Sequence, residues 1–150
     1  MASRRIADDI RKYFPFLFNV HGFTVTSETH FESFGNWVVV LESKECRLRF
    51  FQDRGEVTIA VGPLWPPSGW QSGPWFDLSV VIRYITQGKD QWEYEGDSTD
   101  EQLKRLAAKL RPYCSQICRL FQKEVFQEKQ QELQEVQAQL EEEFWNSLKP

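Results

Sequence analysis

The spacing of apolar residues changes from helical to strand-like within the first quarter of the chain. Over residues 3–18, apolar side chains recur at steps of three and four, which predicts a helix with one buried face. Pro15 should end or kink this helix near Tyr13, because the residue before a proline avoids the helical conformation. His21-Gly22 is typical of a turn. Over residues 23–61 the apolar period is two, which predicts β-strands.

A first hairpin can be placed by pairing apolar residues across a candidate turn. A two-residue turn at Arg54-Gly55 sets Phe50 opposite Ile59 and Leu48 opposite Val61, so all four side chains share one face. A three-residue loop would instead set an apolar residue against a polar one. The pattern therefore favours the tighter turn.

A second hairpin follows from the same reasoning. A turn at Ser43-Lys44 sets Val39 opposite Leu48 and keeps the shared face apolar. The three strands predicted in this way cover residues 37–42, 45–53 and 56–62. An earlier strand within residues 23–34 should join the edge beside Trp37, but the pattern leaves its register open.

The second half of the chain predicts helices that follow a loop rich in Trp, Pro and Gly. These three residue types fill ten of the fourteen positions in residues 62–75, a composition that excludes regular structure. An apolar stripe predicts a short helix over residues 76–87. The spacing of Ser98 and Glu101 is that of a capping box and predicts the start of a long helix. We therefore expect an α+β fold, with an antiparallel β-meander of three to four strands, helices packed on one face, and a long C-terminal helix.

The composition of the chain changes within the predicted C-terminal helix, which becomes polar and acidic. We expect a single α+β domain over residues 1–126 and a polar, acidic continuation of the helix over residues 127–150. Seven glutamates and three lysines beyond Gln122 account for the whole net charge of −4. The apolar residues of this segment at helical spacing are Leu133, Val136 and Leu140. This thin seam could form a homodimer, dock on its own domain, or stand in solvent.

Charge and hydropathy exclude two classes of partner. No apolar run approaches the roughly 20 residues that cross a bilayer, and the N-terminus lacks the apolar stretch of a signal peptide. We therefore expect a soluble, cytoplasmic protein with no membrane partner. Neither half of the chain carries the basic stripe of a nucleic-acid-binding protein, so we expect no nucleic-acid partner.

The cysteine content predicts free thiols. The chain has three cysteines, at positions 46, 114 and 118, and an odd number in a reducing compartment argues against disulfides. Cys114 and Cys118 are four residues apart and share one helix face. No further pair of Cys or His is spaced to complete a metal site, so we expect small buried packing residues, no metal and no cofactor.

The Trp-rich loop is the first candidate for a binding site. Its tryptophans, Trp65, Trp70 and Trp75, are large, rigid and amphipathic, and rings that a short loop cannot bury often anchor a partner. Alternatively, the loop folds back over the sheet edge and its rings belong to the core.

The outer face of the predicted sheet is the second candidate. Alternation with the core residues assigns to this face the charged or titratable side chains Glu28, His30, Glu32, Arg47, Arg49 and Glu56. Of these, His30, Arg47 and Arg49 are the candidate binding residues, and Val38 and Val40 add apolar surface. Alternatively the face is solvated, as one face of an antiparallel sheet commonly is.

Catalytic chemistry has little support in the sequence. His30 lies between Glu28 and Glu32 and could act as an acid–base group, but no nucleophile accompanies it in the pattern. We find no Gly-rich phosphate loop, His-Glu-x-x-His pair or Gly-x-Ser-x-Gly elbow. We therefore expect no catalytic residue.

These observations predict a non-enzymatic protein-interaction module. In its general order only, the run of hairpin, Trp-Phe-Asp-Leu helix and capped C-terminal helix resembles that of many small uncharacterised bacterial proteins, some of them immunity-type proteins that neutralise a toxin. The resemblance implies an inhibitor or immunity-type role, has no diagnostic motif and identifies no functional residue. An acidic surface suits a basic protein partner. The alternatives are a small-ligand-binding domain with the Trp-rich loop as a lid, and an enzyme of unknown type.

Overall fold

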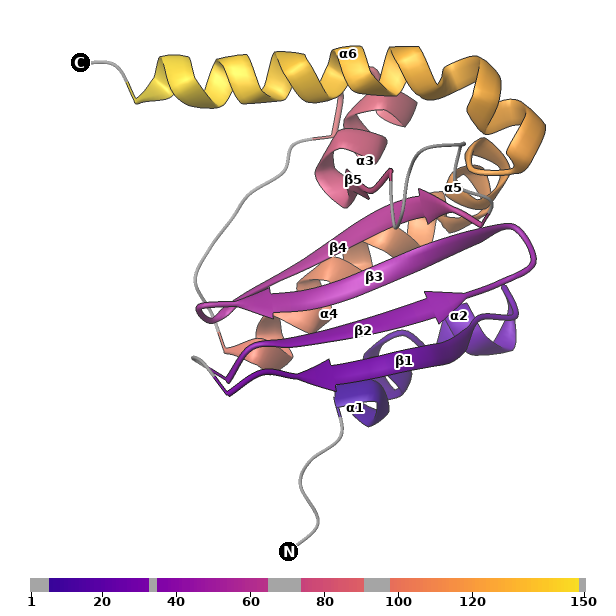
Figure 1. Cartoon of the computed structure of the whole chain (residues 1–150), viewed down its shortest axis with the longest axis vertical. Coiled ribbons are helices and arrows are strands. Elements are labelled where there is room, and N and C mark those ends of the chain that lie inside the picture. Colours follow the sequence, from indigo (N-terminus) through magenta and orange to yellow (C-terminus); the bar gives the residue numbers. More distant parts are fainter. Residues whose placement is uncertain (1–5, 33–34, 65–73, 91–97, 149–150) are drawn as a thin grey trace, which may run out of the picture.

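The computed structural model describes residues 6–32, 35–64, 74–90 and 98–148. A five-stranded antiparallel sheet with strand order β1-β2-β3-β4-β5 forms its centre (Figure 1). The strands are β1 (Thr24–His30), β2 (Trp37–Glu42), β3 (Cys46–Asp53), β4 (Glu56–Pro63) and β5 (Phe76–Asp77). The helices are α1 (Ile6–Tyr13), α2 (Pro15–Asn19), α3 (Leu78–Thr86), α4 (Thr99–Leu110), the 3₁₀ turn η2 (Arg111–Tyr113), α5 (Cys114–Leu120) and α6 (Lys123–Ser147).

The predicted α+β class is confirmed. Helices α1, α2 and α4 lie behind the sheet in Figure 1, while α3 and α6 lie beyond the edge formed by β4 and β5. The long C-terminal helix is α6, with 25 residues. The sequence pattern missed β5, because Phe76 and Asp77 were included in the following helix. They pair instead with Val61 and Ala60 of β4.

The Arg54-Gly55 hairpin has the predicted register, with Phe50 opposite Ile59. Both turn residues have positive φ angles, 52° for Arg54 and 86° for Gly55. Positive φ at both positions is the signature of the type I′ turn, whose twist matches that of the flanking strands.

The other hairpin turns one residue later than predicted. Lys44-Glu45 is the turn, and the register of β2 on β3 moves by two residues, so that Val39 lies opposite Phe50. The hydroxyl of Ser43 accepts hydrogen bonds from the backbone N–H groups of Glu45 (3.1 Å) and Cys46 (3.2 Å), which fixes the later turn. A shift of two leaves every side chain on its predicted face, because the strand period is two.

Strand β1 corrects the prediction for the outer face. Val25 lies opposite Leu41, but the next pair is Ser27 with Val40, so a β-bulge interrupts the alternation. Beyond the bulge, Glu28 and His30 lie on the helix-covered face of the sheet rather than the outer one. The backbone N–H of Ala7 in α1 donates a hydrogen bond of 2.8 Å to Oε1 of Glu28, which confirms this orientation.

The last helical region is interrupted where a continuous apolar stripe was expected. Phe121 and Phe126 are both buried and their rings stack at 5.2 Å between centroids. Five residues of straight helix would set these side chains about 140° apart, so one helix could not direct both to the same place. The chain breaks at Phe121-Gln122, and α6 leaves in a new direction.

Helix α6 docks on its own domain. Leu133 of the predicted seam is fully buried, while Val136 and Leu140 are partly buried against the same core. Arg83 of α3 donates two hydrogen bonds to the carboxylate of Glu143, of 2.6 and 2.7 Å. Among the described helices, none combines the length and apolar character that crossing a bilayer requires.

Candidate functional site

The outer sheet face carries an aromatic ring that the fold places there through a glycine. The register of β5 on β4 sets Trp75, one residue before the strand, opposite Gly62. A Cβ atom on Gly62 would lie 2.9 Å from the carbonyl oxygen of Pro74 and 3.0 Å from the Trp75 ring. Only glycine therefore allows this close crossing, and the indole can extend across β4 towards β3.

Two arginines of β3 meet this indole. The guanidinium carbon of Arg47 lies 4.6 Å from the centroid of the Trp75 ring, and that of Arg49 lies 4.7 Å from it. Arg47 also donates a hydrogen bond of 3.0 Å from Nε to the carbonyl of Pro63. Arg49 lies 5.2 Å from the ring of Phe51 as well. We call Arg47, Arg49, Phe51 and Trp75 the Arg–Trp patch.

Arg49 is the electrostatically unusual member of the patch. Its Nε atom is inaccessible to solvent and has no hydrogen-bond acceptor among the described residues. Burial and the neighbouring charge of Arg47 lower the pKa of the Arg49 guanidinium. Thr58, on the same face of β4, also has a buried hydroxyl without a partner. Buried polar groups are normally satisfied, so the patch has hydrogen-bonding capacity that its described surroundings leave unused.

The surroundings of the patch are apolar and open. Val38 and Val40 of β2 are half-buried on the same face, and Ala60 of β4 is 4% exposed. No helix within the described part of the chain covers this side of the sheet (Figure 1).

The structure thus brings together three of the six candidate binding residues. Arg47, Arg49 and Trp75 come from two separate predictions, the outer face and the Trp-rich loop, and form one surface. His30 is separated from them by the sheet, with its Nε2 atom 3.5 Å from Oε2 of Glu28. Trp65 and Trp70 lie outside the described residues.

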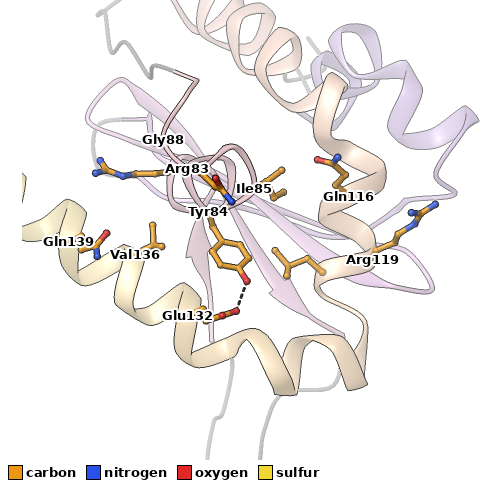
Figure 2. A pocket seen from close by; sticks show the side chains of 11 residues that line it. Arg83, Tyr84, Ile85, Gly88, Gln116, Arg119, Glu132, Val136 and Gln139 are labelled. Carbon is orange, nitrogen blue, oxygen red and sulfur yellow. Dashed lines mark hydrogen bonds between the residues drawn. The ribbon is translucent and has the colours of Figure 1, made fainter.

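Apart from the Arg–Trp patch, the structure contains a groove between α3, α5 and α6. It has a volume of about 760 Å³ and its lining includes Arg83, Tyr84, Arg119 and Val136 (Figure 2). The hydroxyl of Tyr84 donates a hydrogen bond of 2.5 Å to Glu132 across the groove. Burial and this hydrogen bond raise the pKa of Tyr84 to about 12, so the phenol stays protonated at neutral pH.

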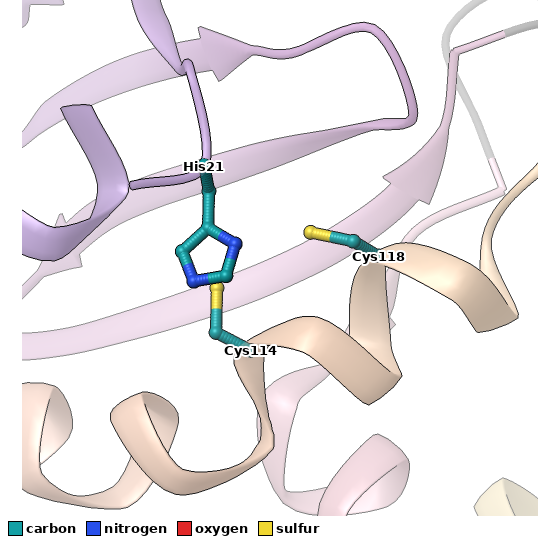
Figure 3. A group of neighbouring side chains, drawn as sticks. All are labelled: His21, Cys114 and Cys118. Atoms are coloured by element: carbon teal, nitrogen blue, oxygen red, sulfur yellow. The ribbon is translucent and has the colours of Figure 1, made fainter. Parts of the chain in front are cut away.

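The structure also gathers side chains that the sequence left apart. Cys114 and Cys118 of α5 point towards the imidazole of His21, in the link between α2 and β1, and their ligand atoms all lie within 4.8 Å of one another (Figure 3). The sulfur of Cys46 lies 3.9 Å from that of Cys118. Hydrogen bonds from the thiols of Cys114 and Cys46 lower the pKa of Cys118, while the bond to Cys118 and burial raise that of Cys46.

The prediction of no metal depended on the lack of further ligands close in sequence. The fold brings His21 and Cys46 close to these cysteines from distant segments, so a lack of candidate ligands close in sequence does not exclude a metal site. The i, i+4 spacing of Cys114 and Cys118 was the only local signal of the cluster.

Comparison with known proteins does not assign the chain to a family. No family model matches it, and neither the curated proteins nor the solved structures contain a significant match. The site must therefore be interpreted from its own geometry.

Proposed function

We propose that the protein is a non-enzymatic protein-interaction module and that the Arg–Trp patch is its binding surface. The observation that carries the proposal is Arg49, a half-buried cation whose Nε lacks an acceptor while its guanidinium lies over Trp75. Among the described residues, Arg49 forms no ion pair. A partner carboxylate would pair with this half-buried charge through the guanidinium nitrogens other than the solvent-inaccessible Nε.

The chemistry of the patch favours a carboxylate-bearing segment of the partner. A guanidinium presents a planar fork of donors that matches a carboxylate, and its position over an indole limits the conformational freedom lost on binding. Trp and Arg are also the residue types that dominate binding energy in protein interfaces. Val38 and Val40 would supply the apolar surface beside this polar anchor.

An inhibitor or immunity-type role is the specific form of this proposal, with the partner a toxin. A basic partner remains part of it, because α6 carries exposed glutamates. A homodimer through α6 also remains a proposal. Because the apolar seam of α6 already packs within its own chain, such a dimer would depend on the exposed residues Phe144, Trp145 and Leu148. Sedimentation as a monomer at high protein concentration would exclude this dimer.

The test is co-purification of the partner with matched arginine variants. Arg49→Gln removes one of the two positive charges of the patch, and Arg119→Gln removes an exposed arginine from the groove as a control. We expect the wild type and R119Q to retain one stoichiometric protein from the source cells, and R49Q to lose it. The purified pair should bind more weakly as salt is raised. Equal retention by R49Q would show that this face is not the binding surface.

A small-ligand-binding domain is the second candidate function. The groove of about 760 Å³ carries it, because its volume is that of known ligand sites and its lining combines arginines with apolar residues. This groove differs from the predicted pocket beneath a Trp-rich lid. Native mass spectrometry should show a retained small molecule that is lost in Arg119→Gln and kept in R49Q. For a protein partner bound at the Arg–Trp patch, the expected loss is instead in R49Q and not in R119Q.

We also propose a cytoplasmic location. All three cysteines are free thiols, although Cys46 and Cys118 lie close together. Such thiols are stable in a reducing compartment. Alkylation of all three thiols after acid quenching of the cells and denaturation of the protein with a chelator would support this location, whereas a disulfide between Cys46 and Cys118 would contradict it.

A further inference from the structure

All the cysteines of the chain and one of its two histidines meet at one point in the core. Cys46 begins β3, Cys114 and Cys118 lie on α5, and His21 lies in the link between α2 and β1. These segments are far apart in sequence, yet the fold brings the sulfur atoms of Cys114 and Cys118 close to the His21 imidazole, and that of Cys46 close to Cys118. Such a set of side chains is the usual ligand set of a metal ion that prefers sulfur and nitrogen.

The distances are close to those of a tetrahedral zinc site. With zinc–sulfur bonds of about 2.3 Å, two thiolates on one tetrahedral ion lie about 3.8 Å apart. The sulfur atoms of Cys46 and Cys118 are 3.9 Å apart. The ligand atoms of His21, Cys114 and Cys118 lie within 4.8 Å of one another, so a contraction of about 1 Å brings them to bonding positions.

The surroundings provide both a closed site and an entry path. The three cysteines are 0%, 1% and 3% exposed, in the order Cys46, Cys114 and Cys118. His21 is only half-buried, and its imidazole lies beside the side chains of Cys114 and Cys118 (Figure 3). The ring is held in place because the backbone N–H of His21 donates a 3.2 Å hydrogen bond to the carbonyl of Phe16. The imidazole edge also meets the Phe16 ring, at 6.4 Å between centroids.

We propose that His21, Cys46, Cys114 and Cys118 bind one Zn²⁺ ion as a structural site. The neutral imidazole gives one nitrogen ligand, and each cysteine binds as a thiolate after releasing its proton to solvent. The ion then joins the α2–β1 link, the start of β3 and α5, three segments that are far apart in the sequence. With four protein ligands the site has no open position, so its role is to stabilise the fold rather than to catalyse a reaction.

The first test uses the wild-type chain alone, kept reduced. Titration of the metal-free protein with Co²⁺ should give the visible bands of a tetrahedral ion and a thiolate-to-cobalt charge-transfer band, saturating at one equivalent. Zn²⁺ should then displace the cobalt and raise the melting temperature, since a ligand of the folded state stabilises it. A titration without the charge-transfer band would overturn the proposal, and so would a melting temperature that Zn²⁺ does not change.

Matched histidine variants test the ligand set. His21→Asn should weaken zinc binding, measured against a chromophoric chelator, by at least about a hundredfold, because even outer-shell partners of a metal ligand contribute 10–100-fold. His30→Asn changes the only other histidine, lies outside the cluster, and should bind zinc as the wild type does. Equal affinities of the two variants would overturn the assignment of His21.

Cys46→Ser tests the fourth ligand. We expect its affinity for Zn²⁺ to fall at least tenfold and its cobalt charge-transfer band to weaken, because one thiolate is lost. An unchanged affinity and spectrum would remove Cys46 from the ligand set and overturn the four-ligand site. Neither result depends on the Arg–Trp patch, so the zinc site can fail or succeed independently of the proposed function.

Discussion

Gly62→Ala tests how the Arg–Trp patch is assembled. The added methyl group would lie 2.9 Å from the carbonyl oxygen of Pro74 and 3.0 and 3.2 Å from two ring carbons of Trp75. Carbon atoms prefer separations of about 3.5–4.0 Å, so the segment that crosses β4 must move away by several tenths of an ångström. The ring would then lose its place beside Arg47 and Arg49.

The magnitude follows from two opposing effects. Overpacking by one methyl group in a tight contact costs about 1–3 kcal/mol. Against it, replacing a strand glycine by alanine gains about 0.5–1 kcal/mol from the unfolded chain, because Gly62 has no positive φ angle that alanine would resist. We expect a net loss of about 1–2 kcal/mol in the free energy of unfolding.

Urea denaturation followed by far-ultraviolet circular dichroism measures this loss. The control is a double-mutant cycle with Trp75→Ala, which removes the ring but leaves the Pro74 carbonyl. The share of the cost that comes from the ring contacts should disappear in that background, giving a coupling energy of about 1 kcal/mol, while the contact with the Pro74 carbonyl remains. A G62A variant as stable as the wild type would refute the close crossing of Trp75 over β4.

Three further predictions concern the fold around the sites. Leu133→Ala should lower the free energy of unfolding by about 2–5 kcal/mol, because Leu133 is fully buried where α6 docks; a loss below 1 kcal/mol by urea denaturation would mean that α6 is not docked. Ser98→Ala should cost about 1 kcal/mol by the same assay, because the Ser98 hydroxyl accepts the N–H of Glu101 at the start of α4, whereas Ser98→Asp should retain the cap. Asp90→Asn should cost about 1 kcal/mol at pH 7, because Asp90 accepts hydrogen bonds from Lys109 (2.8 Å) and Tyr113 (2.7 Å) that lower its pKa. Because the pKa of Asp90 is lowered in the folded state, its contribution to stability is present above the unfolded pKa of about 3.9 and is lost as the pH falls through the folded pKa. The difference in free energy of unfolding between wild type and D90N should therefore shrink between about pH 5 and pH 2. A difference that stays constant over this range would contradict the role given to Asp90.

Local interactions explain the parts of the fold that the sequence predicted. The type I′ turn at Arg54-Gly55 depends on two residues and their flanking strands, and its register was correct. The cap of α4 depends on Ser98 and a residue three positions on. The alternation in β3 assigned Arg47 and Arg49 correctly to the outer face. Each of these features is decided within a few residues, which is the range that a pattern can report.

The sites required contacts between distant segments. A bulge in β1, unsupported by any local pattern, reversed the face of His30, and the crossing of Trp75 over Gly62 depends on a two-residue strand that pairs with β4. The cysteine cluster joins positions 21, 46, 114 and 118. The sequence by itself determined the class of fold, most of its elements and the faces of three strands, because propensity and periodicity act locally. Only the tertiary structure decided which side chains share a surface or a cluster, because these contacts follow from the packing of helices and the register of strands.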